Sequence, residues 1–182
     1  LQTVGYHFLS SRRVDYNNDL HTVENYFDLA RGFLQEDLDV TAFDRFIPIE
    51  EKSIAQGKAI LDEQIKGDYI VICPYATNLH KGRNKEWPFW RNFCTEYKEA
   101  KIVAVVSESD YMRCRNDFPE ILVLSNTLAI SAYIMREAKF VLANDSGAMH
   151  LASFFGANII GLFGATEINK TRPWFGSVQV GT

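Results

Sequence analysis

The residues best suited to chemistry follow Ala143, where an apolar segment gives way to a helical pattern. Residues 144–152 read Asn-Asp-Ser-Gly-Ala-Met-His-Leu-Ala. Asp145 or Ser146 can cap the helix, and Gly147 lets a ligand come close to the backbone. The first amides of such a helix lack intrahelical partners and lie at the positive end of its dipole. This segment therefore predicts an anion site, well suited to phosphate.

His150 lies one turn beyond Ser146 on the same helix face, so it can point at the same ligand. The alternative interpretation is a capped helix that carries a core histidine. A serine hydrolase fits poorly, because the first glycine of the G-x-S-x-G motif is missing. A metal site fits poorly too, because Asp145 and His150 are splayed around the helix and no cysteine or second histidine is near.

A second polar segment, residues 74–88, follows the apolar run that ends at Cys73 and is locally basic in an acidic chain. We expect Trp87-Pro88 to start the next helix, because proline fits a first helical turn. The alternative is a solvated loop whose charges face water. Five of its side chains can neutralise or hydrogen-bond a diphosphate: Thr77, Asn78, Lys81, Arg83 and Lys85.

Both segments need a scaffold, and the apolar pattern supplies one. Short apolar runs predict strands buried on both faces at 69–73, 102–106, 121–124, 140–143 and 159–163. Helical patterns lie between them at 87–98, 109–116, 128–137 and 146–155. This alternation predicts an α/β fold, a Rossmann-like parallel sheet with helices on both faces. Ligands bind beyond the carboxyl ends of such strands, where both polar segments fall.

The region upstream of the sheet has a different character. Helical spacing predicts helices over 21–34 and 54–65, with an irregular segment between them that contains Pro48. The chain begins with Leu1 rather than methionine, so we expect it to be a fragment of a longer protein.

Composition narrows the function classes. The 182 residues are 47% hydrophobic and 23% charged, a globular balance that excludes a disordered tail, a collagen-like repeat or a low-complexity linker. A net charge of −4 argues against a dedicated nucleic-acid binder. Three cysteines without motif spacing predict free thiols in a reducing compartment. No apolar run is long enough to span a bilayer, and no signal-peptide pattern is visible.

Three motifs together resemble the bacterial ADP-heptose:lipopolysaccharide heptosyltransferases of glycosyltransferase family 9. They are Lys85-x-Trp87-Pro88, the 144–152 segment, and the Leu-Phe-Gly-Ala-Thr run at 162–166. The resemblance extends from about residue 21 to residue 176. It implies the C-terminal half of a GT-B glycosyltransferase, in which two Rossmann-like domains face a cleft. Residues 1–34 would be the tail of the N-terminal acceptor domain, 35–49 a linker, and 50–182 the nucleotide-sugar donor domain.

The resemblance also implies roles for single residues. It places Asp145 near the transferred sugar, Glu108 on the nucleoside and Thr127 beside the adenine. Asn78 departs from the hydroxyl residue usual at its position, and the loop from Tyr75 to Lys85 is longer than expected. The donor phosphates would be held by Thr77, Asn78, Lys85, Ser146, Gly147 and His150.

The expected reaction moves a heptose-like sugar from a nucleotide-diphosphate donor, ADP-heptose, to a lipopolysaccharide core acceptor. No metal or other cofactor is expected, and the catalytic base is expected in the missing N-terminal domain. The implied partners are the nucleotide-sugar donor, a lipid-linked saccharide acceptor and peripheral contact with the cytoplasmic face of the inner membrane. The alternatives are another GT-B sugar transferase, a nucleotide-sugar epimerase, or a non-catalytic nucleotide-binding module.

Overall fold

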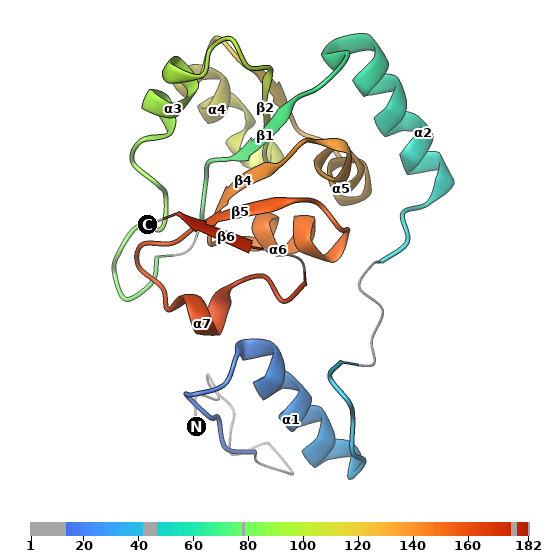
Figure 1. Cartoon of the computed structure of the whole chain (residues 1–182), viewed down its shortest axis with the longest axis vertical. Coiled ribbons are helices and arrows are strands. Elements are labelled where there is room, and N and C mark those ends of the chain that lie inside the picture. The colour runs from blue at the N-terminus through green and yellow to red at the C-terminus, as the bar shows by residue number, and fades with distance from the viewer. Residues whose placement is uncertain (1–13, 42–46, 78, 176–177, 182) are drawn as a thin grey trace. The chain divides into compact units, whose positions relative to one another are not determined.

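A computed structural model describes residues 14–41, 47–77, 79–175 and 178–181 (Figure 1). The chain divides into two compact units. One comprises residues 1–44 with 167–171, and the other comprises residues 45–166 with 172–182.

The first unit contains helices α1 (Thr22–Leu34) and α7 (Ile168–Thr171). Helix α1 confirms the helix expected over 21–34. It begins with a capping box, in which His21 Nδ1 accepts from the Val23 amide and Glu24 accepts from the His21 amide. Two hydrogen bonds join the Asn25 side chain to the Asn17 backbone, at 2.8 and 2.9 Å. The polar turn before α1 is therefore fixed to the helix.

The second unit is built on one parallel sheet in the order β3-β2-β1-β4-β5-β6. This is the strand order of a Rossmann sheet, and it confirms the expected fold class. The last strand was not anticipated from the sequence, whereas the five others fall within the expected apolar runs to within one residue. The strands are β1 (Ile70–Cys73), β2 (Ile102–Val105), β3 (Leu122–Leu124), β4 (Val141–Asn144), β5 (Ile159–Leu162) and β6 (Val178–Gly181).

Helices connect these strands and precede the first of them. Helix α2 (Glu51–Ile60) runs on through the π-helical turn η2 (Leu61–Ile65) into β1. The crossovers contain α3 (Trp90–Glu96), the 3-10 turn η3 (Glu108–Asp110) with α4 (Tyr111–Asp117), α5 (Leu128–Glu137) and α6 (Gly147–Phe154).

Two expected helix starts are wrong. Helix α2 begins at Glu51, earlier than the apolar spacing indicated. Helix α3 begins at Trp90, so Pro88 lies in the turn before it rather than in its first turn. The physical reason is that Trp87 precedes Pro88, and the residue before a proline is disfavoured in the helical conformation. The Trp87 amide donates instead to Asn144 Oδ1 at 2.9 Å.

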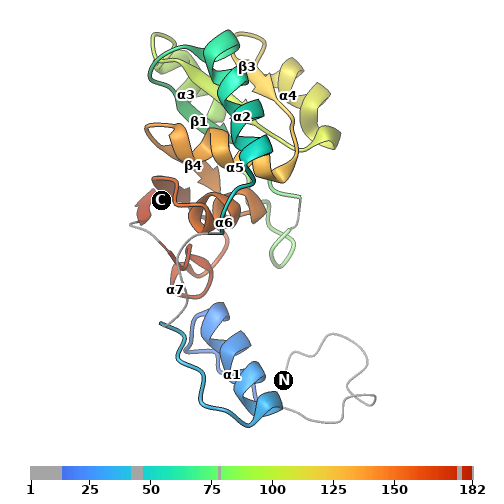
Figure 2. The same ribbon diagram turned by 90° about the vertical axis from the view of Figure 1, so that its right-hand side faces the viewer.

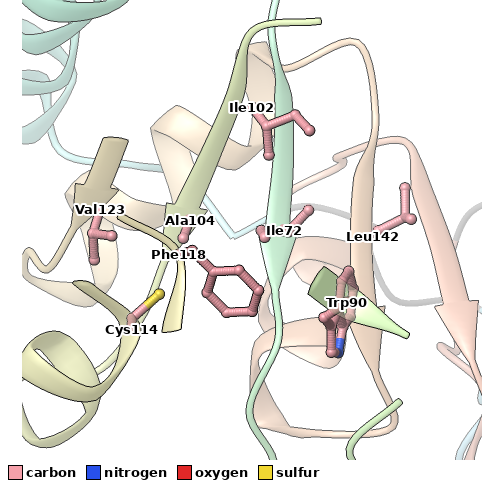
Figure 3. Close-up of a cluster of buried hydrophobic side chains, with 8 residues drawn as sticks. All are labelled: Ile72, Trp90, Ile102, Ala104, Cys114, Phe118, Val123 and Leu142. Atoms are coloured by element: carbon pink, nitrogen blue, oxygen red, sulfur yellow. The ribbon is translucent and has the colours of Figure 1, made fainter. Parts of the chain in front are cut away.

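A hydrophobic cluster joins α3 and α4 to one face of the sheet (Figure 3). The strands supply Ile72, Ile102, Ala104, Val123 and Leu142. The two helices supply Trp90 and Cys114, and Phe118 directly follows α4. Right-handed crossovers place α5 and α6 on the opposite face, where α2 packs against α5 (Figures 1 and 2). Gly57 allows this close approach, since a Cβ there would collide with the Tyr133 ring.

In the part of the chain that the structure describes, no helix is long and apolar enough to cross a membrane. The three cysteines are free thiols, as expected: Cys73, Cys94 and Cys114.

Candidate functional site

The sheet order reverses between β1 and β4, because the chain passes from β1 to β2 on one side and from β4 to β5 on the other. Loops that leave the carboxyl ends of two such strands diverge and open a crevice. A cavity of about 510 Å³ lies there, and we call it the switch-point cavity. It is lined by residues from the loops after β1, β2, β3 and β4 and from helices α5 and α6.

One end of the switch-point cavity is formed by the start of α6. Ser146 occupies the N-cap position in an extended conformation, but its side chain makes no capping bond, contrary to expectation. Its Oγ is buried and has no hydrogen-bond partner among the described residues. A Cβ built on Gly147 would meet nothing within 4 Å, so a ligand can reach the backbone there. The arrangement offers a hydroxyl and free helix amides to an anion.

A cation faces the same end of the cavity from the loop after β1. Lys85 Nζ lies 3.5 Å from Asp145 Oδ2, and the two side chains are 17% and 6% exposed. This separation is longer than a typical charge-assisted hydrogen bond. The Lys85 ammonium group therefore has hydrogen-bonding capacity left for an anionic ligand, while Asp145 lies buried beside it.

Asn144 joins the two loops, a role that its place in the 144–152 segment did not indicate. It is fully buried at the end of β4. Its Nδ2 donates to the Pro74 carbonyl at 2.6 Å, and its Oδ1 accepts from the Trp87 amide at 2.9 Å. The Asn144 side chain thereby fixes both ends of the segment that carries Thr77 and Lys85.

The longer loop after β1 contains a tight hairpin. His80 and Arg83 exchange backbone hydrogen bonds of 3.0 and 2.9 Å. Lys81 and Gly82 between them have φ of 50° and 77°, as in a type I′ turn. The two exposed cations of this hairpin, at 81 and 83, lie outside the cavity lining, whereas Lys85 is part of it. Only one of the three cations expected at the diphosphate is therefore brought to the cavity.

Of the other described residues expected at the phosphates, only one is placed in the cavity lining. Thr77 lines the cavity. Asn78 lies outside the described residues. His150 is half-buried on α6 and is not part of the cavity lining, so the structure does not bring it together with Ser146 at the ligand space.

The other end of the switch-point cavity has apolar walls and polar side chains suited to a nucleoside. Asp110 lies there and accepts a 2.6 Å hydrogen bond from Ser107 Oγ. Asn126 contributes an amide from the loop after β3. Both follow carboxyl ends of strands, and that signal could have identified them from the sequence. The apolar walls are Val105, Val106, Leu128 and Met135.

Two residues expected on this side are neighbours of the lining rather than members of it. Glu108 is exposed in η3. Thr127 is the N-cap of α5, where its Oγ1 accepts from the Ile130 amide at 3.5 Å. Asp110 and Asn126 occupy the lining positions next to them.

Burial raises the pKa values of two titratable groups that line the cavity, Cys73 and Tyr75. Burial raises the pKa of Cys73 to about 12, so this thiol is protonated at neutral pH and is a poor nucleophile. Burial and a hydrogen bond to Asp117 raise the pKa of Tyr75 above its usual range. No group of three metal-ligating side chains occurs among the residues that the structure describes. The arrangement offers hydrogen-bond donors to an anion at one end of the cavity and apolar walls with polar side chains at the other.

Comparison with known proteins agrees with the sequence resemblance. The model of glycosyltransferase family 9 (heptosyltransferase) matches residues 4–181. The chain is similar to the E. coli ADP-heptose lps heptosyltransferase II, with a TM-score of 0.74 and 20% identity over 92% of this chain and 56% of that one. It is also similar to a glycosyl transferase family 9 structure from Veillonella parvula, with a TM-score of 0.74 and 18% identity over 93% and 50%.

The E. coli heptosyltransferase WaaC with ADP has a TM-score of 0.65 and 20% identity over 95% of this chain and 53% of that one. No curated protein gives a match. The chain thus spans about half the length of the solved structures that it matches.

Proposed function

Because this chain belongs to glycosyltransferase family 9, we propose that it forms the nucleotide-sugar donor site of a heptosyltransferase. The donor is ADP-heptose or a close analogue, and the acceptor is the lipopolysaccharide core. The WaaC structures with ADP and with ADP-2-deoxy-2-fluoro heptose support this choice of donor.

The observation that carries the proposal is the polarity of the α6 end of the switch-point cavity. The buried Ser146 hydroxyl lacks a partner among the described residues, and Gly147 leaves the backbone open to a ligand. Lys85 lines the same space. Hydroxyl, amide and ammonium groups all donate hydrogen bonds, and the oxygens of a diphosphate can accept every one of them. The apolar far end then suits the nucleoside of the same ligand.

These groups also suit the chemistry of sugar transfer. When the bond from the sugar to the diphosphate breaks, negative charge develops on the leaving oxygen. Lys85 and the start of α6 are fixed beforehand and stabilise that charge without reorganisation, which is the most effective form of electrostatic catalysis. In this scheme charge stabilisation comes from protein groups and needs no metal ion.

The acceptor side completes the proposal. A base on the acceptor domain removes the proton of the acceptor hydroxyl, and domain closure brings base and donor together. We propose that most of this acceptor domain lies outside these 182 residues, which span about half the length of the matched structures, with residues 1–34 as its tail and 50–182 as the donor domain. The lipid-linked acceptor places the enzyme in peripheral contact with the cytoplasmic face of the inner membrane.

Calorimetric titration of the chain with ADP, UDP and GDP, followed by a donor-consumption assay, tests the proposal. We expect ADP to bind and the other two nucleotides to bind more weakly. We also expect no turnover of the donor by these 182 residues in the presence of acceptor, and turnover by the longer protein. Failure to bind any nucleoside diphosphate would refute the donor site. Turnover by the short chain at the rate of the longer protein would refute the assignment of the base.

A further inference from the structure

A charged and aromatic cluster supports the loop that carries Lys85. Of its members, Tyr75 lines the switch-point cavity, whereas Arg113, Glu86 and Asp117 do not. Arg113 of α4 forms two hydrogen bonds with the Glu86 carboxylate, at 3.0 and 2.7 Å. Its guanidinium carbon lies 4.0 Å from the centre of the Tyr75 ring, and its Nε lies 3.6 Å from Asp117 Oδ2. Tyr75 in turn donates a 2.7 Å hydrogen bond to the same Asp117 oxygen. A single guanidinium group thus contacts both ends of the loop formed by residues 75–86.

The helix that presents Arg113 is itself fixed. Cys114 of α4 and Phe118, the residue that directly follows this helix, are buried in the core cluster against strand residues such as Ala104 and Ile72 (Figure 3). Arg113 and Asp117 are the sequence neighbours of these two core residues, on the helix between β2 and β3. The guanidinium position is therefore set by the core rather than by the loop that it contacts.

Glu86, which Arg113 holds, affects the loop at two places, Ala76 and Lys85. Glu86 Oε1 accepts a 3.4 Å hydrogen bond from the Ala76 amide, so the carboxylate closes the loop from within. Tyr75 and Ala76 both line the switch-point cavity, and Lys85 directly precedes Glu86. A shift of Glu86 would be transmitted to Lys85, because consecutive residues share one peptide plane.

The contact between Arg113 and Glu86 also has an electrostatic effect on the proposed diphosphate site. Glu86 is only 18% exposed and lies next to the residue that faces the proposed diphosphate. A carboxylate at this place repels a phosphate group unless a cation neutralises it. The bidentate geometry suits a guanidinium group, which matches a carboxylate better than an ammonium group does. Arg113 is half-exposed but is held by four contacts, so it remains in place to neutralise Glu86.

We propose that Arg113 is a positioning residue for donor binding, which orients Lys85 toward the diphosphate and neutralises Glu86 behind it. The proposal rests on the proposed function of the switch-point cavity. It assigns a role in diphosphate recognition to a side chain that does not line the cavity.

Calorimetry with ADP and with adenosine on four variants tests this role. We expect Arg113→Ala to lose about tenfold in ADP affinity, a size typical of coupling within one charge network, and adenosine affinity to change by less than about twofold. Arg113→Lys restores charge without the bidentate geometry and recovers only part of the loss. The double variant Arg113→Ala with Glu86→Gln removes the uncompensated carboxylate and should regain part of the ADP affinity. Arg115→Ala on the same helix, an exposed cation without an ion pair among the described residues, is the matched control.

Equal losses for ADP and adenosine, or no gain in the double variant, would reduce Arg113 to a structural residue and overturn the proposal. An unchanged ADP affinity in Arg113→Ala would overturn it as well. Hydrogen exchange of the Ala76 amide distinguishes a failure of the loop support from a failure of the proposed donor site. We expect this exchange to accelerate in Arg113→Ala whether or not nucleotide binds. A wild-type chain that binds no nucleotide refutes the proposed function, and unaltered exchange refutes the support of the loop.

Discussion

Replacing Gly147 should have opposite effects on the stability of the protein and on its affinity for ADP. Gly147 is the first residue of α6, and its φ is outside the left-handed region. A Cβ there would meet nothing within 4 Å. A Cβ at this position is therefore accommodated by the protein, and Gly147→Ala should stabilise the helix by up to about 1 kcal/mol because glycine is a poor helix former.

Ligand binding should change in the opposite direction. Gly147 lines the switch-point cavity, so an added side chain occupies the space from which a phosphate oxygen reaches the helix amides. Losing one or two hydrogen bonds to a charged group costs about 1.5–3 kcal/mol each. We expect Gly147→Val to weaken ADP binding by roughly a hundredfold, since 1.4 kcal/mol corresponds to a factor of ten. Gly147→Ala should lie between this variant and the wild type.

Thermal unfolding and calorimetry on the same samples measure both effects. Gly57→Ala serves as the opposite control, because its Cβ would collide with Tyr133 between α2 and α5, away from the cavity lining. We expect that variant to lower the Tm and leave ADP affinity per folded molecule unchanged. A folded Gly147→Val protein that binds ADP like the wild type would show that the start of α6 is only a helix terminus.

Three other predictions concern the same unit. Lys85→Ala should weaken ADP binding by about 1.5–3 kcal/mol and AMP binding much less, and an equal loss for both ligands in calorimetry would contradict its assignment to the diphosphate. Asn144→Ala removes one buried and one partly buried hydrogen bond and should lower the free energy of unfolding by about 2–3 kcal/mol, as measured in urea. The three cysteine thiols should react slowly with Ellman's reagent at pH 8 until the protein unfolds, because burial raises their pKa above the usual 9.0. The free energy of unfolding should fall as the pH rises past 9.0, because the thiols then lose their protons more readily in the unfolded chain. These thiols have pKa values of about 12 for Cys73 and about 11 for Cys94 and Cys114.

The sheet could be predicted because its strands are buried on both faces. Continuous apolar runs such as Ile70–Cys73 are typical of strands in a parallel sheet that is covered by helices on both faces. The last strand, Val178–Gly181, reads Val-Gln-Val-Gly and offers too few apolar residues to stand out. The start of α3 was placed too early because Trp87 precedes a proline and is therefore disfavoured in a helix. Its amide is held by the Asn144 side chain, a bond across 57 positions of sequence that helix-start rules do not consider.

The candidate site was predictable where local chemistry defines it. Ser146 and Gly147 follow a strand and begin a helix, and that pattern alone favours phosphate. The cations of the first loop looked equivalent in the sequence, but the hairpin at residues 80–83 takes two of them away from the cavity. The turn has glycine at its second central position but lysine at the first, where asparagine or aspartate is the usual signal.

The hydrogen bond between Asn144 and the Pro74 carbonyl spans 70 positions of sequence, and this separation has a consequence for folding. The entropy of closing the intervening chain is lost before such a contact can stabilise the fold, so contacts of this kind slow folding. During synthesis from the N-terminus, β1, β2 and β3 are complete while β4 is still missing, so β1 presents an unpaired edge. We expect the switch-point cavity to be among the last features to assemble, and nascent chains that end before Val141 to be the forms most prone to aggregation or chaperone capture.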